Sequence, residues 1–161
     1  MKNENFQKIL LNLEGLENKY YIYDVTGKTF VGSTDKVEID FSQNGAGLFA
    51  LLPYRVRSVE LNIPNSIITI GGKMNFNVRI VPQEAQSTPV RHVIMVELYD
   101  PSGRLISCYS SEMEISEWSS VGELHLTENE KPGRWIIKVT DIVSGKQAER
   151  AFVIRPEGSV R

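Results

Sequence analysis

The chain has 161 residues, of which 41% are hydrophobic and 24% are charged, the composition of an ordinary globular protein. The formal charge of −2 and the scatter of lysines and arginines exclude the basic surface of a nucleic-acid-binding protein. No run of 18 apolar residues occurs, so neither a membrane-spanning helix nor membrane insertion is expected. The length suffices for one sandwich of roughly 100 residues together with a smaller β module.

Residues 1–56 predict a small antiparallel β module. Its candidate strands are the runs KILLNL, YYIYDV, VEIDF and LFALLPY. The opening stretch FQKILLNLEGLE fits helical spacing as well as alternation, and a strand is favoured because everything downstream has strand character. The first 15 residues lack the apolar core and cleavage site of a signal peptide, so none is expected and the compartment stays open.

Residues 57–156 carry seven candidate strands separated by turn signals such as PNS, GG, DPSG and EKPG. KMNFNVRIV alternates apolar and polar residues, as in an antiparallel strand with one face in a core. HVIMVELYD is apolar on both faces and predicts a central strand. Seven short strands over about a hundred residues are typical of an immunoglobulin-like sandwich.

The expected fold class is therefore all-β: an antiparallel immunoglobulin-like β-sandwich preceded by a small antiparallel β module. The join PYRVRS is short and rather apolar, so we expect the two modules to pack together. The polar residues 157–161 are expected to form a frayed tail.

A short pattern recurs three times, in YDVTGKTFV, YDPSGRLIS and TDIVSGKQA. Each copy has an Asp, then a polar residue and Gly, then a basic residue. A repeated ligand loop is one interpretation, but turn chemistry is favoured, with Asp capping its own backbone and Gly supplying a positive φ. In the third copy we expect Asp141, Ser144 and Gly145 to turn the chain, while Trp135 and Phe152 pack in the core.

Catalytic and metal-binding patterns are absent from the sequence. It has no Gly-x-Ser-x-Gly elbow and no phosphate-binding glycine-rich loop. His92 and His125 each fall on a predicted strand without a third His or a second Cys for a metal site. We therefore expect no catalytic residue, no metal ligand and no cofactor. Cys108, in the strand-like run LISCYSS, is expected to be a small packing residue rather than a reactive thiol.

The acidic residues do not single out a catalytic pair. Glu112, Glu114 and Glu117 alternate with Met113, Ile115 and Trp118 in SSEMEISEW. A pair of carboxyl groups at a set separation would suit glycoside hydrolysis. A solvated strand face or a loop explains the same alternation, and we favour that interpretation.

Two aromatic residues are candidates for ligand binding, because sugars stack on exposed aromatic rings. Trp118 falls in a loop-like region, whereas Trp135 suits the core of a sandwich. Tyr20 precedes Tyr21 and Tyr23 and faces the opposite way in a strand. Trp118 and Tyr20 are therefore the candidate carbohydrate-binding residues.

Two stretches resemble known families. Residues 20–56 resemble the small antiparallel domain that follows the catalytic barrel in bacterial glycoside hydrolases, including β-galactosidase-like families. The likeness lies in a YD…TGK…G hairpin, here Tyr23 to Gly32, and in the FALLPY strand from Phe49 to Tyr54. The next hundred residues resemble immunoglobulin-like and fibronectin type III-like sandwiches. The hairpin PGRWIIKVTDIVSGK is similar to those of macroglobulin-type domains.

The resemblance implies a non-catalytic accessory region of a larger, carbohydrate-active bacterial protein, with a parent that is secreted or periplasmic. Its expected partner is the catalytic or neighbouring domain of that parent, contacted through an apolar patch around Phe49, Leu51 and Tyr54. Self-association and carbohydrate binding are further options. The alternatives are a carbohydrate-binding module and an adhesion or surface-assembly domain.

Overall fold

The computed structural model describes residues 8–14, 19–33, 36–40, 47–85 and 87–156. Within these ranges the protein is all-β, as predicted, and its one helical element is the 3-10 turn η1 (Ser107–Tyr109). No helix in the described ranges is long and apolar enough to cross a membrane. The predicted tail at 157–161 lies outside the described residues.

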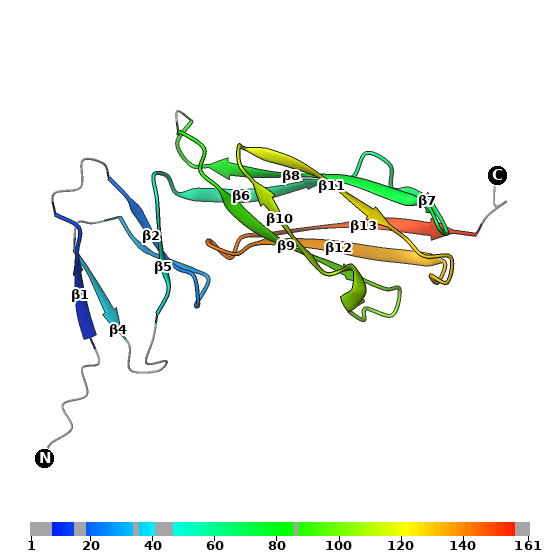
Figure 1. The fold of residues 1–161 in the computed structure, drawn as a ribbon, viewed down its shortest axis with the longest axis horizontal. Helices are drawn as coiled ribbons and strands as arrows, with labels where there is room; N and C mark the ends of the chain where they lie inside the picture. The colour runs from blue at the N-terminus through cyan, green and yellow to red at the C-terminus, as the bar shows by residue number, and fades with distance from the viewer. Residues whose placement is uncertain (1–7, 15–18, 34–35, 41–46, 86, 157–161) are drawn as a thin grey trace, which may run out of the picture.

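The larger part of the chain forms a sandwich of two sheets (Figure 1). One sheet has the order β11-β8-β6, with the strands β6 (Val56–Asn62), β8 (Lys73–Pro82) and β11 (Ser119–His125). The other has the order β10-β9-β12-β13-β7, with the strands β7 (Ile67–Thr69), β9 (His92–Tyr99), β10 (Ser111–Ile115), β12 (Gly133–Asp141) and β13 (Gln147–Arg155). This three-plus-five arrangement confirms the predicted all-β sandwich. Its departure from an antiparallel sandwich is the parallel pairing of β7 with β13.

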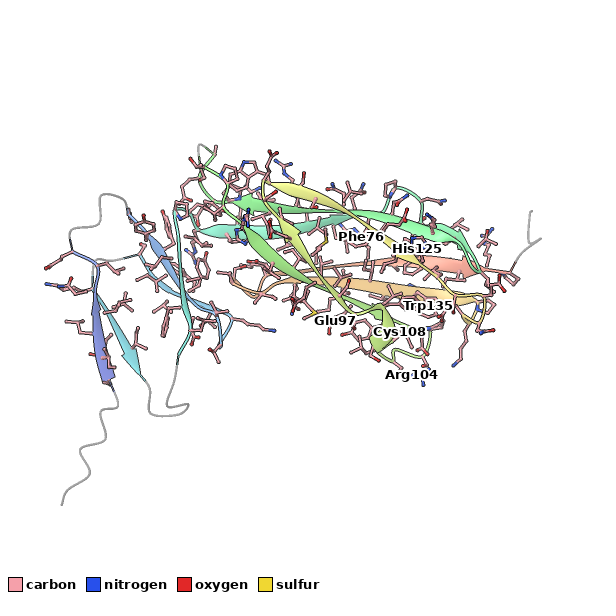
Figure 2. The ribbon with its side chains drawn as sticks, in the orientation of Figure 1. Phe76, Glu97, Arg104, Cys108, His125 and Trp135 are labelled. Carbon is pink, nitrogen blue, oxygen red and sulfur yellow. The ribbon has the colours of Figure 1, made fainter. Side chains whose placement is uncertain are left out.

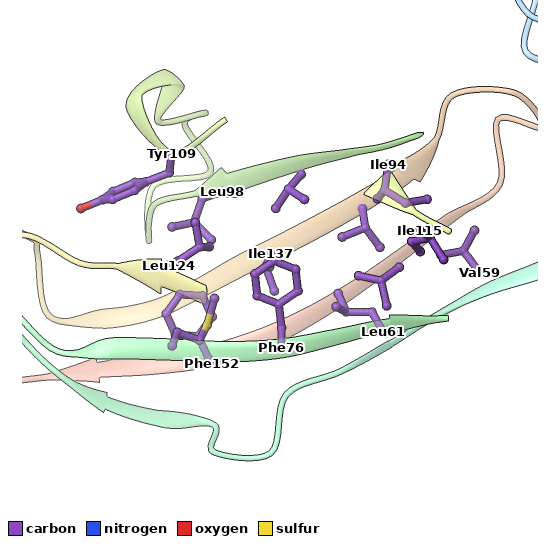
Figure 3. Packing of buried hydrophobic residues seen from close by; sticks show 14 of the residues in the cluster. Val59, Leu61, Phe76, Ile94, Leu98, Tyr109, Ile115, Leu124, Ile137 and Phe152 are labelled. Atoms are coloured by element: carbon purple, nitrogen blue, oxygen red, sulfur yellow. The ribbon is translucent and has the colours of Figure 1, made fainter. Parts of the chain in front are cut away.

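The sandwich core follows the alternation seen in the sequence. Side chains from β8, β9 and β12 interdigitate between the sheets (Figure 3). Strand β9 lies between β10 and β12 and is central, as its two-sided apolar pattern predicts. Trp135 and Phe152 are cross-strand partners, both buried, with ring centroids 6.4 Å apart. The TDIVSGKQA hairpin therefore closes the sandwich, as expected.

The described residues before Pro53 form two small antiparallel sheets. One is the pair β1 (Lys8–Asn12) and β4 (Lys36–Asp40); the other has the order β3-β2-β5, with the strands β2 (Tyr21–Asp24), β3 (Thr29–Gly32) and β5 (Phe49–Leu52). Ile22, Val37 and Ile39 make a small core between these sheets. The strand at the opening stretch, favoured over a helix, is confirmed by β1.

The three-stranded sheet packs on one end of the sandwich (Figure 1). Tyr23, Leu52 and Tyr54 belong to the same buried cluster as the sandwich core. The hydroxyl of Tyr23 accepts a hydrogen bond of 2.8 Å from the backbone N–H of Val56, where β6 begins. The chain passes from β5 to β6 through three residues, so the two parts share buried side chains across a short connection.

Two local expectations were wrong. Cys108 is exposed, and it lies in the η1 turn on the loop that projects from the sandwich (Figure 2), not in a strand. The buried member of that run is its neighbour Tyr109, whose hydroxyl accepts the N–H of Thr127 at 2.9 Å. In the first Asp-Gly hairpin, the positive φ falls on Lys28 (φ 53°) rather than on Gly27. The other two copies use Gly103 and Gly145, as expected.

Candidate functional site

Four polar side chains from distant parts of the chain meet where the small module joins the sandwich. Nε2 of His92, on β9, lies 2.8 Å from the hydroxyl of Tyr54, and Nδ1 lies 2.8 Å from Oδ1 of Asp141 at the end of β12. The second oxygen of Asp141 accepts hydrogen bonds from the N–H, at 3.0 Å, and the hydroxyl of Ser144. We call these residues the junction network: Tyr54, His92, Asp141 and Ser144.

One tautomer of His92 satisfies both contacts of its ring. With the proton on Nδ1, the ring donates to the Asp141 carboxylate and accepts the Tyr54 O–H on Nε2, whereas the other tautomer would set a lone pair against Asp141. The Tyr54 oxygen also lies 3.4 Å from the backbone N–H of Val90. Every polar side-chain group of the network therefore has a partner, as a buried network requires.

The junction network is closed to solvent. The side chains of His92 and Asp141 are 0% exposed, as is Tyr54. The ring of Trp118 packs on Tyr54, with centroids 5.1 Å apart, and that of His92 stacks on it from 5.9 Å. A His–Asp pair can act as a general base only if a substrate reaches it. The arrangement instead joins the connection between β5 and β6, which holds Tyr54, to two strands of the sandwich.

The adjoining turns also fit closely. Gly145 has a φ of +68°, and a Cβ built on it would lie 2.5 Å from the carbonyl oxygen of Lys28 in the β2–β3 turn. Glycine is thus needed for its backbone conformation and for the close approach of the small module. The Asp141 carboxylate thus stabilises the β12–β13 hairpin turn through Ser144 and the contact between the modules through His92.

Burial raises the pKa of Tyr54 to about 12, and the charge of Asp141 acts in the same direction. Since the folded-state pKa lies above the ordinary value of 10, the folded state keeps a proton that the unfolded chain loses. We expect the free energy of unfolding to fall by up to about 2 kcal/mol as the pH rises from 10 to 12. Urea unfolding across that range measures this, and Tyr54→Phe should flatten the profile. An equal fall in the variant would assign the effect to other groups.

The two predicted ligand-binding residues, Trp118 and Tyr20, are both half-buried. Trp118 does lie in the loop between β10 and β11, but it is half-buried against Tyr54. Tyr20 is half-buried and directly precedes β2. The structure does not bring the two together in any described contact. Sugar binding by either residue stays a prediction.

Other aromatic faces near the junction are already covered. Tyr21 and Tyr23 share one face of β2 and both contact Phe30. The guanidinium of Arg55 lies over the Phe30 ring at 4.4 Å, and Nζ of Lys19 lies 5.7 Å from the Tyr21 centroid. These cations occupy the faces on which a sugar would stack. The Tyr21 side chain also donates a 2.7 Å hydrogen bond to Glu84.

The other titratable side chains singled out in the sequence lie at the surface of the described structure. His125 is exposed and lies 2.6 Å from Glu123 on the same strand. Glu112, Glu114 and Glu117 are solvent-exposed, as expected. Across the described ranges, no group of three or more His, Cys, Asp or Glu side chains could hold a metal ion.

Comparison with known proteins finds no family. No family model matches the chain, and no curated protein matches it significantly. Similar solved structures include the CARDB domain of a Pyrococcus furiosus protein, solved with two metal ions (12% identity, 61% of this chain and 86% of that chain, TM-score 0.42). A β-glucosidase from Listeria innocua matches at 14% identity over 71% of this chain and 18% of its own, with a TM-score of 0.44.

A glycoside hydrolase family 2 member from Bacteroides cellulosilyticus matches at 8% identity over 86% of this chain, with a TM-score of 0.45. The chain spans 22% of that hydrolase. Likenesses this remote carry no argument about substrate or activity.

Proposed function

We propose that the chain is a non-catalytic accessory region of a larger, carbohydrate-active protein, and that its small module packs against a catalytic or neighbouring domain. The resemblance of residues 20–56 to accessory domains of glycoside hydrolases supports the carbohydrate-active parent. The sealed junction network supports a structural role, because its side chains are buried and hydrogen-bonded to one another.

The observation that carries this proposal is the set of apolar side chains that the small module leaves in solvent. Their exposed fractions run from 38% to 63%, and they are Ile9, Leu10, Val31, Leu48 and Leu51. Apolar side chains left in solvent are available for contact with a neighbouring domain. They include Leu51 of the patch expected from the sequence, whereas Tyr54 is wholly buried and Phe49 packs on the small core, so Leu51 is the exposed member of the three expected residues.

The two small sheets also leave strand edges open. Among the described strands, β1 pairs only with β4, and β5 lies at the edge of its sheet. A two-stranded sheet is marginal by itself in water. A neighbouring domain packed here would cover apolar side chains and unpaired backbone groups together.

The test starts from the coding sequence on either side of this chain. If it continues into a catalytic domain, the longer protein and this chain are compared by amide hydrogen exchange. We expect exchange in β1 and β5 to slow at least tenfold in the longer protein, since each tenfold step reflects about 1.4 kcal/mol of protection. Leu10→Gln with Leu48→Gln should abolish the difference.

The matched control is Val121→Gln, which changes a 70% exposed side chain on the sandwich instead. It should leave the protection of β1 and β5 intact. Equal exchange in the long and short proteins, or the absence of any adjoining domain, would contradict the proposal.

A further inference from the structure

A shallow groove of about 450 Å³ lies on the outer face of the sheet β11-β8-β6. Its lining is almost entirely polar and consists of Glu60, Leu61, Asn62, Asn77, Arg79 and Arg150. Cross-strand register places Glu60 beside Arg79 and Asn62 beside Asn77, while Arg150 reaches the groove from β13 of the other sheet. The groove thus collects side chains from three strands and both sheets.

The two ends of this sheet face differ in how their side chains are paired. At one end, marked by His125 in Figure 2, Glu123 binds both Lys73 at 3.2 Å and His125 at 2.6 Å. In the groove, the side chains of Glu60 and Arg79 are adjacent, yet neither takes part in any hydrogen bond or ion pair among the described residues. The same holds for the amides of Asn62 and Asn77.

We propose that this groove binds a glycan and prefers one that carries a carboxylate, as a uronic acid does. Two guanidinium groups against one carboxylate leave an excess of one positive charge at the site. Arginine forms bidentate hydrogen bonds with carboxylates. Arg150 already donates one hydrogen bond to the carbonyl of Glu149, at 2.9 Å, which steadies its guanidinium at the groove while other N–H groups stay available.

The mixture of donors and acceptors distinguishes a glycan from other ligands. A sugar hydroxyl both donates and accepts, so a ring can satisfy the Glu60 carboxylate and the Asn77 amide together. Sulfate only accepts at its oxygens and has no hydroxyl group to donate to the Glu60 carboxylate. A protein partner needs an apolar anchor in a desolvated pocket, and the only apolar lining residue, Leu61, is buried in the core.

No residue of the small module lines this groove, so its test is independent of the docking proposal. The chain, labelled with ¹⁵N, is titrated with oligogalacturonate, a neutral cello-oligosaccharide, sulfate and a Glu-rich peptide. We expect oligogalacturonate to shift the amides of residues 60–62 and 77–79, with binding about tenfold tighter than for the neutral sugar.

Two substitutions and a control sharpen the test. Arg79→Gln and Arg150→Gln should each weaken oligogalacturonate binding about tenfold, the loss of one charge-assisted hydrogen bond. Lys73→Gln, at the paired end of the same face, should leave it unchanged. The proposal is overturned if sulfate or the peptide shifts the same amides equally, if none shift, or if the shifts centre on Trp118 and Tyr20.

Discussion

His92→Ala is expected to lower the free energy of unfolding by about 3–5 kcal/mol, although the His92 side chain is wholly buried. The reason is the Asp141 carboxylate, which would stay buried with its Oδ1 unpaired once the imidazole is gone. Chemical denaturation at neutral pH measures the loss. His125→Ala removes the other histidine from an exposed site and should change stability by less than about 0.5 kcal/mol.

A double-mutant cycle separates the interaction from the truncation. Asp141→Ala alone should also destabilise, because it removes the cap on Ser144 as well as the His92 contact. The double variant should cost about 2 kcal/mol less than the sum of the single variants, because it leaves neither His92 nor Asp141 as a buried group without its partner. Simple additivity would show that the two side chains are not coupled.

Gly122→Val is expected to cost about 3 kcal/mol or more, by overpacking the core. Gly122 on β11 faces Phe76 on β8, and a Cβ at this position would lie 2.2 Å from Cζ of the ring (Figure 3 shows Phe76). The ring would have to leave its place between the sheets. Urea unfolding, with near-ultraviolet circular dichroism for aromatic packing, follows both effects.

Gly103→Ala is the matched control for that substitution. Gly103 has a φ of +80°, but nothing lies within 4 Å of a Cβ built there. Only backbone strain is then expected, about 1 kcal/mol. If Gly122→Val were no worse than this control, the close packing of Phe76 against Gly122 would be refuted.

The strands of this protein are predictable from sequence because most bury one face only. Alternation in β8 places Met74, Phe76 and Val78 inward, and each is buried. Strand β7, with only three residues, Ile67–Thr69, escaped prediction. It has too few side chains to show a period, and its pairing partner, β13, lies more than eighty residues away.

The junction network could not be predicted in the same way. Asp141 appears in the sequence as one of three equivalent turn residues, and its Gly145 and Ser144 contacts are indeed turn chemistry. Its contact with His92 spans 49 residues, and that of His92 with Tyr54 spans 38. No local pattern encodes such distances. The one usable signal in the sequence is His92, which begins a strand with apolar residues at alternate positions.

The parallel pair β7–β13 has a consequence for how the sandwich carries load. Its hydrogen bonds, from Val153 N–H to the Ser66 carbonyl and from Ile70 N–H to the Arg155 carbonyl, are both 2.8–2.9 Å long. A force that pulls the segment before Ser66 away from the segment after Arg155 acts along β7 and β13 in opposite directions. The bonds are then sheared together rather than opened one after another. Strand β7 is short and adds little to the core, but its pairing with β13 makes the sandwich resist stretching between these two segments.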